Sequence, residues 1–392
     1  MMHAQTTVVC GLWTVDFMFG SVPVANNIFD ASLWARVPFH FWSLVFFVFG
    51  CNIGSFLNVC IHRLPLGQSI VSPPSHCPHC KYSIPWYLNI PLVTWLWLRG
   101  KCRNCGAPIS PRYFLVELLT GVVFLACWNV FGHQSAVLAL VYCLFIAGLI
   151  VATFIDFEHF IIPDEITFGG IAVGFVISIF FWRLHDRNTL AGGVIQSLLG
   201  IGAGAGLIYA ILRIGKLLFG RQRMEIPENV KIIFSETGIY LGEKEIPYEE
   251  LFYRRSDVIT LHARTIELAD RCYRDVRVRL TPQKLEIGED EFNPEQVPHM
   301  EADSAEVVLP REAMGFGDVK FMAAIGGFLG WQAVIFSLMV SSIIGSVVGI
   351  GLIVLRKREW SSRLPYGPYI ALAAVIWIFG GKHVFEMLFL PK

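Results

Sequence analysis

Charged side chains are scarce in this sequence. Only 16% of the 392 residues are Asp, Glu, Lys or Arg, and 31 residues of each sign cancel to a net charge of zero. Hydrophobic residues make up 54%, and the mean hydropathy is +0.56. A water-soluble chain of this length needs more polar surface than such a composition provides. We therefore expect a polytopic membrane protein with the lipid bilayer as a partner, and we expect no nucleic-acid partner.

Several common signatures are also missing. The N-terminal region lacks the basic stretch of a secretory signal peptide, so none is expected. No His-Glu-x-x-His and no Gly-x-Ser-x-Gly motif occurs. Their absence excludes the usual zinc-protease and serine-nucleophile classes.

The few charges are unevenly distributed along the chain. Residues 221–311 hold 19 of the 31 acids and 13 of the 31 Lys and Arg residues. Residues 230–234 and 276–280 are rich in strand-forming side chains, and turns are indicated at Thr237-Gly238 and Gly288-Glu289. We predict a small β-rich accessory domain at 221–311, whose role the sequence does not indicate.

Long apolar runs dominate the rest of the chain. About eight are predicted to cross the bilayer as helices: residues 39–61, 113–131, 136–155, 166–182, 190–212, 319–329, 333–355 and 369–390. The predicted order is a lead-in (1–38), the first span (39–61), a polar loop (62–111), further spans (112–220), the insertion (221–311) and the last spans (312–392). The fold class is thus an α-helical membrane bundle with a polar loop and a β-rich insertion. The glycine run at 200–206 lies mid-span, where close helix packing is favoured over nucleotide binding.

Basic residues beside the spans indicate the orientation, because Lys and Arg accumulate on the cytoplasmic side of membrane proteins. They occur at Arg63 and in the polar loop, at Arg213 and Lys216, and at 356–358. Counting crossings then places both termini outside. The polar loop, the turn at 156–164, the insertion and Asp318 are predicted to lie on the cytoplasmic side.

The polar loop carries two cysteine pairs, Cys77-Pro-His-Cys80 and Cys102-Arg-Asn-Cys105, with 21 residues between them. Four thiolates at this spacing are typical of a tetrahedral Zn²⁺ site. A zinc ion with four protein ligands has no open position for water, so we predict a structural zinc. Reduced thiols or disulfides are the alternative, although a cytosolic loop disfavours disulfides.

Two acids lie where a chain enters the membrane. Asp156 ends the third predicted span, and Asp318 begins the sixth within Gly315-Phe-Gly317-Asp318. Charge beside hydrocarbon is costly, so ionisable residues there indicate function. Two nearby carboxylates share a proton, which lets one activate a water while the other donates to a scissile carbonyl. We predict that Asp156 and Asp318 form one proteolytic site, with Gly315 and Gly317 allowing unusual backbone angles and close approach of a substrate.

Each of these acids also has a structural alternative. Asp318 precedes an apolar run and fits a helix N-cap, whereas Asp156 ends a span, where the helix dipole disfavours an anion. Helix capping is favoured over catalysis for Asp164, which precedes a span. Glu117, a few residues inside the second span, is expected to be a supporting polar contact.

Further motifs are spread along the apolar part of the chain. They are Gly-Ser-Phe-Leu-Asn-Val at 54–59, Pro-Arg-Tyr-Phe-Leu-Val-Glu at 111–117, Ile-Asp-Phe-Glu-His-Phe-Ile-Ile-Pro-Asp at 155–164, Gly-Phe-Gly-Asp-Val-Lys at 315–320 and Leu-Pro-Tyr-Gly-Pro-Tyr at 364–369. Together with the two cysteine pairs, they resemble the type IV prepilin peptidases, the leader peptidases of pili and type II secretion.

The resemblance implies a multi-pass enzyme of the bacterial inner membrane that removes a short basic leader from prepilins or pseudopilins on the cytoplasmic side. It assigns catalysis to Asp156 and Asp318 and the zinc loop to the four paired cysteines. Many members also methylate the new N-terminus with S-adenosylmethionine, an activity implied by the resemblance alone. Two features depart from the family: Glu158 stands where an Asp is often found, and the insertion is larger than in the simplest members.

Functions of other classes are also compatible with the sequence. Intramembrane acids relay protons in some transporters, and a zinc-bearing membrane protein can be a scaffold without catalysis. Cleavage of a prepilin by purified protein in detergent would separate these hypotheses, because transport requires sealed vesicles and peptide hydrolysis does not.

Overall fold

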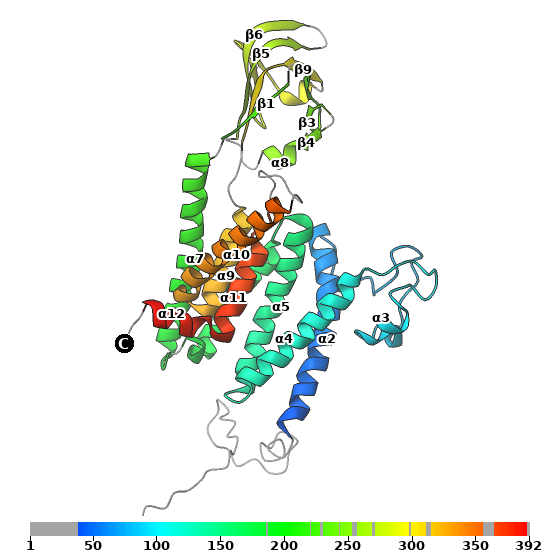
Figure 1. Cartoon of the computed structure of the whole chain (residues 1–392), viewed down its shortest axis with the longest axis vertical. Coiled ribbons are helices and arrows are strands. Elements are labelled where there is room, and N and C mark those ends of the chain that lie inside the picture. The colour runs from blue at the N-terminus through cyan, green and yellow to red at the C-terminus, as the bar shows by residue number, and fades with distance from the viewer. Residues whose placement is uncertain are drawn as a thin grey trace, which may run out of the picture. The chain divides into compact units, whose positions relative to one another are not determined.

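The computed structural model describes residues 38–185, 187–219, 221–227, 230–242, 244–252, 257–268, 271–297, 299–310, 315–355 and 364–389. The predicted lead-in at 1–38 lies outside them except for residue 38. The chain forms two compact units. One, here called the helical unit, contains the chain up to Ala205 and from Gly317 onward; the other, the sheet unit, is Gly206–Phe316 (Figure 1).

Helices occupy all eight stretches that were predicted to be spans. Their bounds are α2 (Phe39–Arg63), α4 (Pro111–Phe131), α5 (Ala136–His159), α6 (Asp164–Phe180), α7 (Leu190–Phe219), α9 (Phe316–Leu329), α10 (Trp331–Val354), and α11 (Gly367–Ile376) continued through a π-helical stretch (Trp377–Gly381) into α12 (Lys382–Phe389). A short helix, α3 (Val93–Trp97), lies in the polar loop.

Six helices in the described part of the chain are long and apolar enough to cross a membrane. Helices α6 and α9, with 17 and 14 residues, are not among them. A straight crossing of about 30 Å needs about 20 residues. The structure therefore supports a helical membrane protein, and the number of eight spans stays a prediction.

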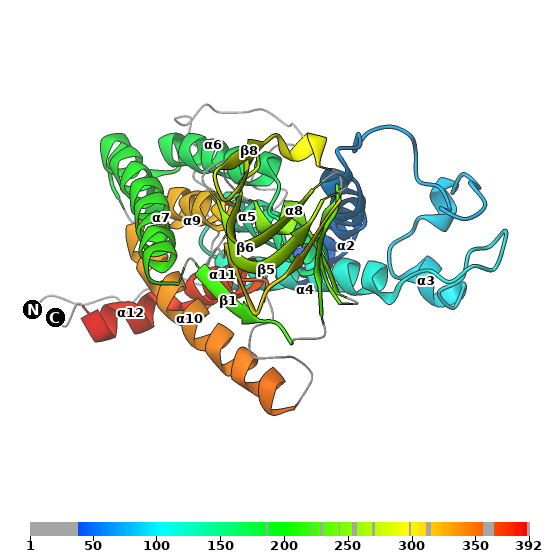
Figure 2. The same ribbon diagram turned by 90° about the horizontal axis from the view of Figure 1, so that it is seen from above.

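Helix α5 lies in the middle of the bundle, between the α2–α4 pair and α9 (Figure 2). Buried residues make up 61% of its apolar stretch, against 44% or less in each of the other candidate spans. The rings of Phe145 on α5 and Phe328 on α9 lie 4.5 Å apart. Helix α5 is therefore the candidate span whose apolar stretch is most enclosed by other parts of the protein.

Glycines bring α7 and α9 into close contact. A Cβ atom at Gly200 would lie 2.0 Å from the carbonyl oxygen of Gly326, and one at Gly204 would lie 2.4 Å from that of Met322. Gly202, on another side of α7, has nothing within 4 Å of this position. Small residues at such spacing let helix backbones pack closely in membranes. The prediction of close helix packing at 200–206 is thus confirmed for the glycines that face α9.

The sheet unit contains ten antiparallel strands within its described residues. Their bounds are β1 (Arg221–Glu225), β2 (Ile232–Phe234), β3 (Gly238–Leu241), β4 (Lys244–Pro247), β5 (Ile259–Glu267), β6 (Cys272–Leu280), β7 (Leu285–Ile287), β8 (Asp290–Phe292), β9 (Met300–Asp303) and β10 (Glu306–Pro310). The order is β4-β3-β2-β9-β5-β6-β7-β8, and β10 pairs with both β1 and β5. The prediction of a β-rich insertion is confirmed, and the hairpin turn at Gly288 has the expected left-handed φ of 63°.

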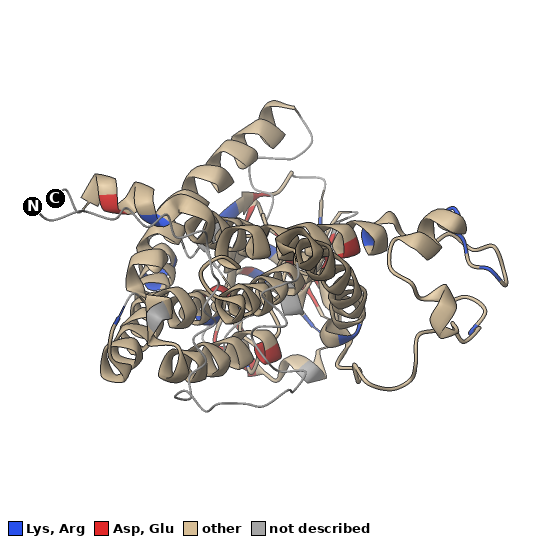
Figure 3. Ribbon diagram, turned by 90° about the horizontal axis from the view of Figure 1, so that it is seen from below, with Lys and Arg blue, Asp and Glu red and all other residues tan. Residues whose placement is uncertain are grey.

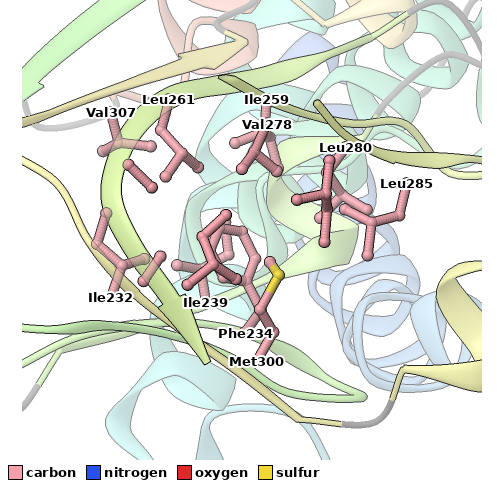
Figure 4. Packing of buried hydrophobic residues seen from close by; sticks show 14 of the residues in the cluster. Ile232, Phe234, Ile239, Ile259, Leu261, Val278, Leu280, Leu285, Met300 and Val307 are labelled. Carbon is pink, nitrogen blue, oxygen red and sulfur yellow. The ribbon is translucent and has the colours of Figure 1, made fainter. Parts of the chain in front are cut away.

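Alternation along the strands builds the core of the sheet unit (Figure 4). On β5, Ile259, Leu261 and Ala263 are buried, whereas His262 and Arg264 are exposed. Ile232, Ile239 and Ile287 join the same cluster from other strands and are fully buried. One face of each strand is thus apolar and the other polar, as expected of a sheet with one face in water.

Candidate active site

Asp156 lies in the last turn of α5, and its side chain is buried. The helix ends because Phe160 adopts a left-handed conformation (φ 56°) and donates its N–H to the carbonyl of Asp156. A non-glycine residue in that region is uncommon. The C-terminal end of α5 alone would disfavour a carboxylate, so the structure must supply a partner from elsewhere.

That partner is the beginning of α11. The backbone N–H of Gly367, the first residue of α11, donates to Oδ2 of Asp156 over 2.9 Å. A helix N-terminus offers N–H groups that have no partner within the helix, and it attracts anions. A Cβ atom at Gly367 would lie only 2.8 Å from the same oxygen. Glycine is therefore required if the carboxylate is to stay where it is.

Asp318 lies in the first turn of α9, and its side chain is 8% exposed. It is the third residue of this helix, so it lies near the helix N-terminus but is not the N-cap that its structural alternative predicted. Burial of a carboxylate at the start of an apolar helix is costly without compensating interactions. An N-terminal position supplies part of that compensation through the helix dipole.

Ile162, in the turn between α5 and α6, lies next to one glycine near each of the two aspartates. A Cβ atom at Gly317, the residue before Asp318, would lie 3.4 Å from Cβ of Ile162. A Cβ atom at Gly367 would lie 3.2 Å from Cδ1 of the same isoleucine. The residue next to Asp318 and the residue that binds Asp156 thus both contact one buried side chain.

Asp164 begins α6 and is tied to α9. Its carboxylate forms an ion pair with Lys320, two residues after Asp318. The ammonium group of Lys320 also lies 5.1 Å from the ring centre of Phe168. Asp164 occupies the first helical position, where an acid stabilises the helix dipole. It is not the N-cap that was predicted, because Pro163 takes the cap position, where there is no side-chain hydrogen bond.

One of the two glycines before Asp318 differs from its prediction. Gly317 lies inside α9 with helical backbone and has no positive φ. The unusual backbone angles expected at Gly317 are therefore not found, and those expected at Gly315 stay a prediction. What the lack of a side chain at Gly317 provides is room beside Ile162.

Ion pairing also ties α4 to the end of α5. Arg112, in the first turn of α4, forms an ion pair with Glu158, two residues after Asp156. The acid at this position, where the family often has Asp, thus has a structural partner. Such a pair orients the helix end but contributes little stability by itself when exposed.

Glu117 belongs to the cysteine loop rather than to the aspartates. Its Oε2 accepts the backbone N–H of Leu92 over 2.8 Å, and its side chain is buried. Leu92 precedes α3 and has a positive φ of 61°. On α4 the backbone beside Glu117 packs against Gly54 of α2, where a Cβ atom would lie 2.7 Å from Cα of Glu117. Glu117 thus holds the loop through this hydrogen bond, and its predicted support of the aspartate site stays a prediction.

The four paired cysteines converge in the loop. Their sulfur atoms all lie within 4.8 Å of one another. The Cys77–Cys105 and Cys80–Cys102 sulfur pairs are 3.9 and 4.0 Å apart. An isolated β-bridge joins the residues on either side of each Cys-x-x-Cys turn. Around the first turn, His76 pairs with Ser83. Such a cluster can bind a metal ion.

Local hydrogen bonds prepare two of these thiols for metal binding. A hydrogen bond from the Asn104 amide, with a further one from the Tyr82 backbone, lowers the pKa of Cys80 to about 6. Backbone hydrogen bonds from Cys105 and Asn104 lower the pKa of Cys102. Because thiolates are the metal-binding form, lower pKa values favour ligation near neutral pH.

Two residues of the candidate site were not predicted from the sequence. Gly367 could have been found, because Gly367-Pro368 before an apolar run indicates a helix start with Pro in the first turn. Ile162 has no comparable pattern. Its position between Gly317 and Gly367 depends on contacts between residues far apart in the chain.

Comparisons with known proteins agree on one family. The model of the type IV leader peptidase family matches residues 143–224 and 304–350. The model of the bacterial peptidase A24 N-terminal domain matches residues 48–131. The unmatched stretch between 224 and 304 corresponds to most of the sheet unit.

Individual relatives match between half and nine-tenths of the chain. It is 29% identical over 374 residues to the prepilin leader peptidase/N-methyltransferase of Aeromonas hydrophila, covering 89% of this chain and 93% of that one. It is 34% identical to the type 4 prepilin-like proteins leader peptide-processing enzyme of an Escherichia coli strain, covering 50% of this chain and 76% of that one. It is 31% identical to the prepilin leader peptidase/N-methyltransferase of Klebsiella pneumoniae, covering 54% and 90%. No solved structure matches the chain.

Proposed function

The chain belongs to the type IV leader peptidase family, and we infer that it is an inner-membrane enzyme that removes the leaders of prepilins. The observation that carries this conclusion is the near-complete coverage of relatives that bear this name, 93% and 90% of the Aeromonas and Klebsiella proteins. Its substrates are prepilins or pseudopilins anchored in the same bilayer.

Asp156 and Asp318 are the catalytic pair of this enzyme in our proposal. Both are buried acids at helix ends, and Ile162 contacts the immediate neighbours of both. Gly367 supports the assignment by holding one oxygen of Asp156 in a fixed position. A preorganised carboxylate avoids reorganisation during the reaction.

The chemistry follows from a shared proton. The ionised carboxylate removes a proton from a water molecule, whose oxygen attacks the scissile carbonyl carbon. The protonated carboxyl group donates its hydrogen to the carbonyl oxygen, which forms a neutral tetrahedral intermediate. As the C–N bond of this intermediate breaks, one of its hydroxyl groups gives its proton back to the carboxylate that had donated its hydrogen, and the departing amine takes the proton that came from water. The pair then returns to its starting state with one shared proton.

A structural zinc ion in the loop fits the cysteine geometry. Thiolates about 2.3 Å from Zn²⁺ at the corners of a tetrahedron lie roughly 3.8 Å apart. The Cys77–Cys105 and Cys80–Cys102 sulfur pairs, at 3.9 and 4.0 Å, are close to this value. Bound zinc would hold the two Cys-x-x-Cys turns together, and hydrolysis does not pass through it.

Two further assignments complete the proposal. The names of the relatives combine a peptidase with an N-methyltransferase, so we include methylation of the new N-terminus with S-adenosylmethionine and assign no residue to the methyl donor. The positive charges beside the spans favour a catalytic face on the cytoplasmic side.

Cleavage of a prepilin by the purified full chain in detergent tests the catalytic pair. Asp156→Asn and Asp318→Asn should each reduce cleavage by at least about 10²–10⁴-fold, the usual contribution of a positioned acid or base. Asp164→Asn is the matched control, because this nearby acid pairs with Lys320 and should retain cleavage. Wild-type cleavage by either aspartate variant would remove that residue from the mechanism.

A further inference from the structure

The cysteine loop has an unusual composition. Between residues 64 and 110 there is no Asp or Glu, while Lys81, Arg99, Lys101 and Arg103 are basic. Residues 86–97, between the two cysteine pairs, carry no charge at all. The loop therefore combines an apolar centre with positively charged flanks, which Figure 3 shows as blue without red beyond α4.

The apolar centre faces outward instead of forming a core. Trp86 and Trp97 are 82% and 71% exposed. Other large apolar side chains of the same segment are exposed as well: Tyr87, Ile90, Val93 and Leu96. An apolar patch of this kind on a loop marks an interaction surface.

The opposite side of the segment is anchored to a membrane span. The Leu92 N–H donates to Glu117, and the ring of Trp95 lies 5.1 Å from that of Phe114. Phe114 and Glu117 lie in the first two turns of α4, a candidate span. Figures 1 and 2 both show α3 beside this end of α4. The exposed side chains are thus held at the depth where a span enters the bilayer.

We propose that residues 86–97 lie in the headgroup region of the surrounding bilayer and dock the cysteine loop onto anionic phospholipid. An uncharged segment of this length is too short to cross, and its exposure excludes a core helix, so an interfacial position is left. Tryptophan and tyrosine prefer the membrane–water interface. The four flanking cations, with no acid to offset them, complement anionic headgroups.

This surface is independent of the proposed peptidase chemistry, because none of its residues is assigned to the aspartate pair. Its physical effect is to hold both Cys-x-x-Cys turns at the membrane surface. A loop surrounded by water would instead leave six large apolar side chains solvated. This is unfavourable because the free energy gained by removing their apolar surface from water would be lost.

Tryptophan fluorescence of the full chain in nanodiscs of phosphatidylethanolamine and phosphatidylglycerol tests the proposal. The difference in emission between the wild type and the Trp86→Phe variant gives the contribution of Trp86. The Trp97→Phe variant gives the contribution of Trp97 in the same way. We expect that emission to be quenched more strongly by lipids brominated near the headgroup than by lipids brominated near the chain end, and to be protected from aqueous acrylamide. Trp128→Phe is the control, since Trp128 is buried in the bundle and its emission should respond weakly to both.

Changing the lipids or the charges should weaken the effect. Replacing phosphatidylglycerol by phosphatidylcholine, or changing Lys81, Arg99, Lys101 and Arg103 together to Gln, should reduce shallow quenching and increase acrylamide access. Emission that acrylamide quenches fully and brominated lipid does not would overturn the proposal. Protection that arises only when a prepilin is added would also overturn it, because the surface would then bind substrate instead of lipid.

Discussion

The helical unit and the sheet unit use charge in opposite ways. In the helical unit acids are few, and two of those near the α5–α6 turn have close partners: Asp156 accepts a hydrogen bond from Gly367, and Asp164 pairs with Lys320. In the sheet unit acids are frequent and line exposed strand faces, as in the Lys231–Glu301 and Lys284–Glu286 pairs. An ionised carboxylate is well solvated in water, whereas placing it beside lipid is unfavourable in free energy.

Because of this difference, a charged residue in the helical unit is a stronger indication of function than one in the sheet unit. The family model covers segments of the helical unit and leaves out most of the sheet unit, which supports our proposal that the scarce acids of the helical unit carry the activity. The abundant acids of the insertion carry no such information. Four experiments can sharpen or break this contrast.

The largest effect is expected in the core of the sheet unit. Ile266 is fully buried on β5, and Ile266→Ala should lower the free energy of unfolding of this unit by about 2–5 kcal/mol through lost burial and a cavity. Hydrogen exchange of the β5 and β9 amides in the full chain measures the change. Prepilin cleavage should stay at the wild-type rate.

The control for this core variant is Thr260→Ala, a change on the half-buried face of the same strand. It should leave hydrogen exchange nearly unchanged. Loss of cleavage in step with the loosening of the sheet would show that the insertion contributes to the active site. The separation of roles between the two units would then be wrong.

Gly367→Ala should have the next largest effect, and on the other unit. The new Cβ atom would lie 2.8 Å from Oδ2 of Asp156, so the carboxylate must move. Displacement of a catalytic group by about 1 Å can reduce the rate roughly 100-fold. Steady-state cleavage kinetics should show this loss in kcat, while Gly351→Ala, where the added atom meets open space, should cleave normally. Equal activity of the two variants would contradict the positioning role of Gly367.

A smaller effect is expected where the cysteine loop joins α4. Glu117→Leu leaves the part-buried N–H of Leu92 without its acceptor, and an unsatisfied donor of this kind costs up to about 1–3 kcal/mol. Hydrogen exchange of residues 92–97 should become faster, and cleavage should persist. Glu117→Gln keeps a carbonyl oxygen for the same N–H and should resemble the wild type. Unchanged exchange in the leucine variant would disprove the anchoring role.

The smallest effect concerns the exposed charges of the sheet unit. Hydrogen bonds from Lys231, with help from His299, lower the pKa of Glu301 below the ordinary value of 4.5. Stabilisation from this pair is therefore present above pH 4.5 and is lost as the pH falls through the lowered pKa. Lys231→Met should weaken that pH dependence, because the contact of Glu301 with His299 then remains.

Hydrogen exchange of β2 and β9 amides, corrected for the pH dependence of unprotected amides, measures this change. The wild type should lose protection as the pH falls below 4.5, and the Lys231→Met variant should lose less. Identical pH profiles would mean that the pair contributes nothing measurable, as is common for exposed ion pairs.

Much of the helical unit could be predicted because hydrocarbon imposes strong rules on sequence. A helix is found at each predicted span, and most boundaries agree within three residues, as for α4 and α10. The largest differences are at α7, which continues to Phe219, and at the last span, which is interrupted by a kink at Gly380. Helix ends depend on caps and packing, which an apolar run does not record.

The candidate site was predicted only in part. We predicted Asp156 and Asp318 because charge beside hydrocarbon is unfavourable, and the four cysteines because of their Cys-x-x-Cys spacing. We did not predict Gly367 or Ile162. The expectation of unusual backbone at Gly317 was wrong because α9 begins before it. Contacts between distant segments decide such details, and no local pattern reports them.

The amino-acid order alone determined which segments are apolar, where ionisable groups interrupt them and which cysteines are paired, because burial energy and ligand spacing act locally along the chain. Only the tertiary structure decided that α11 begins against Asp156 and that Ile162 lies between the surroundings of both aspartates. The reason is physical: helix packing fixes which ends meet, and that depends on the fit of whole helix surfaces rather than on any one stretch of sequence.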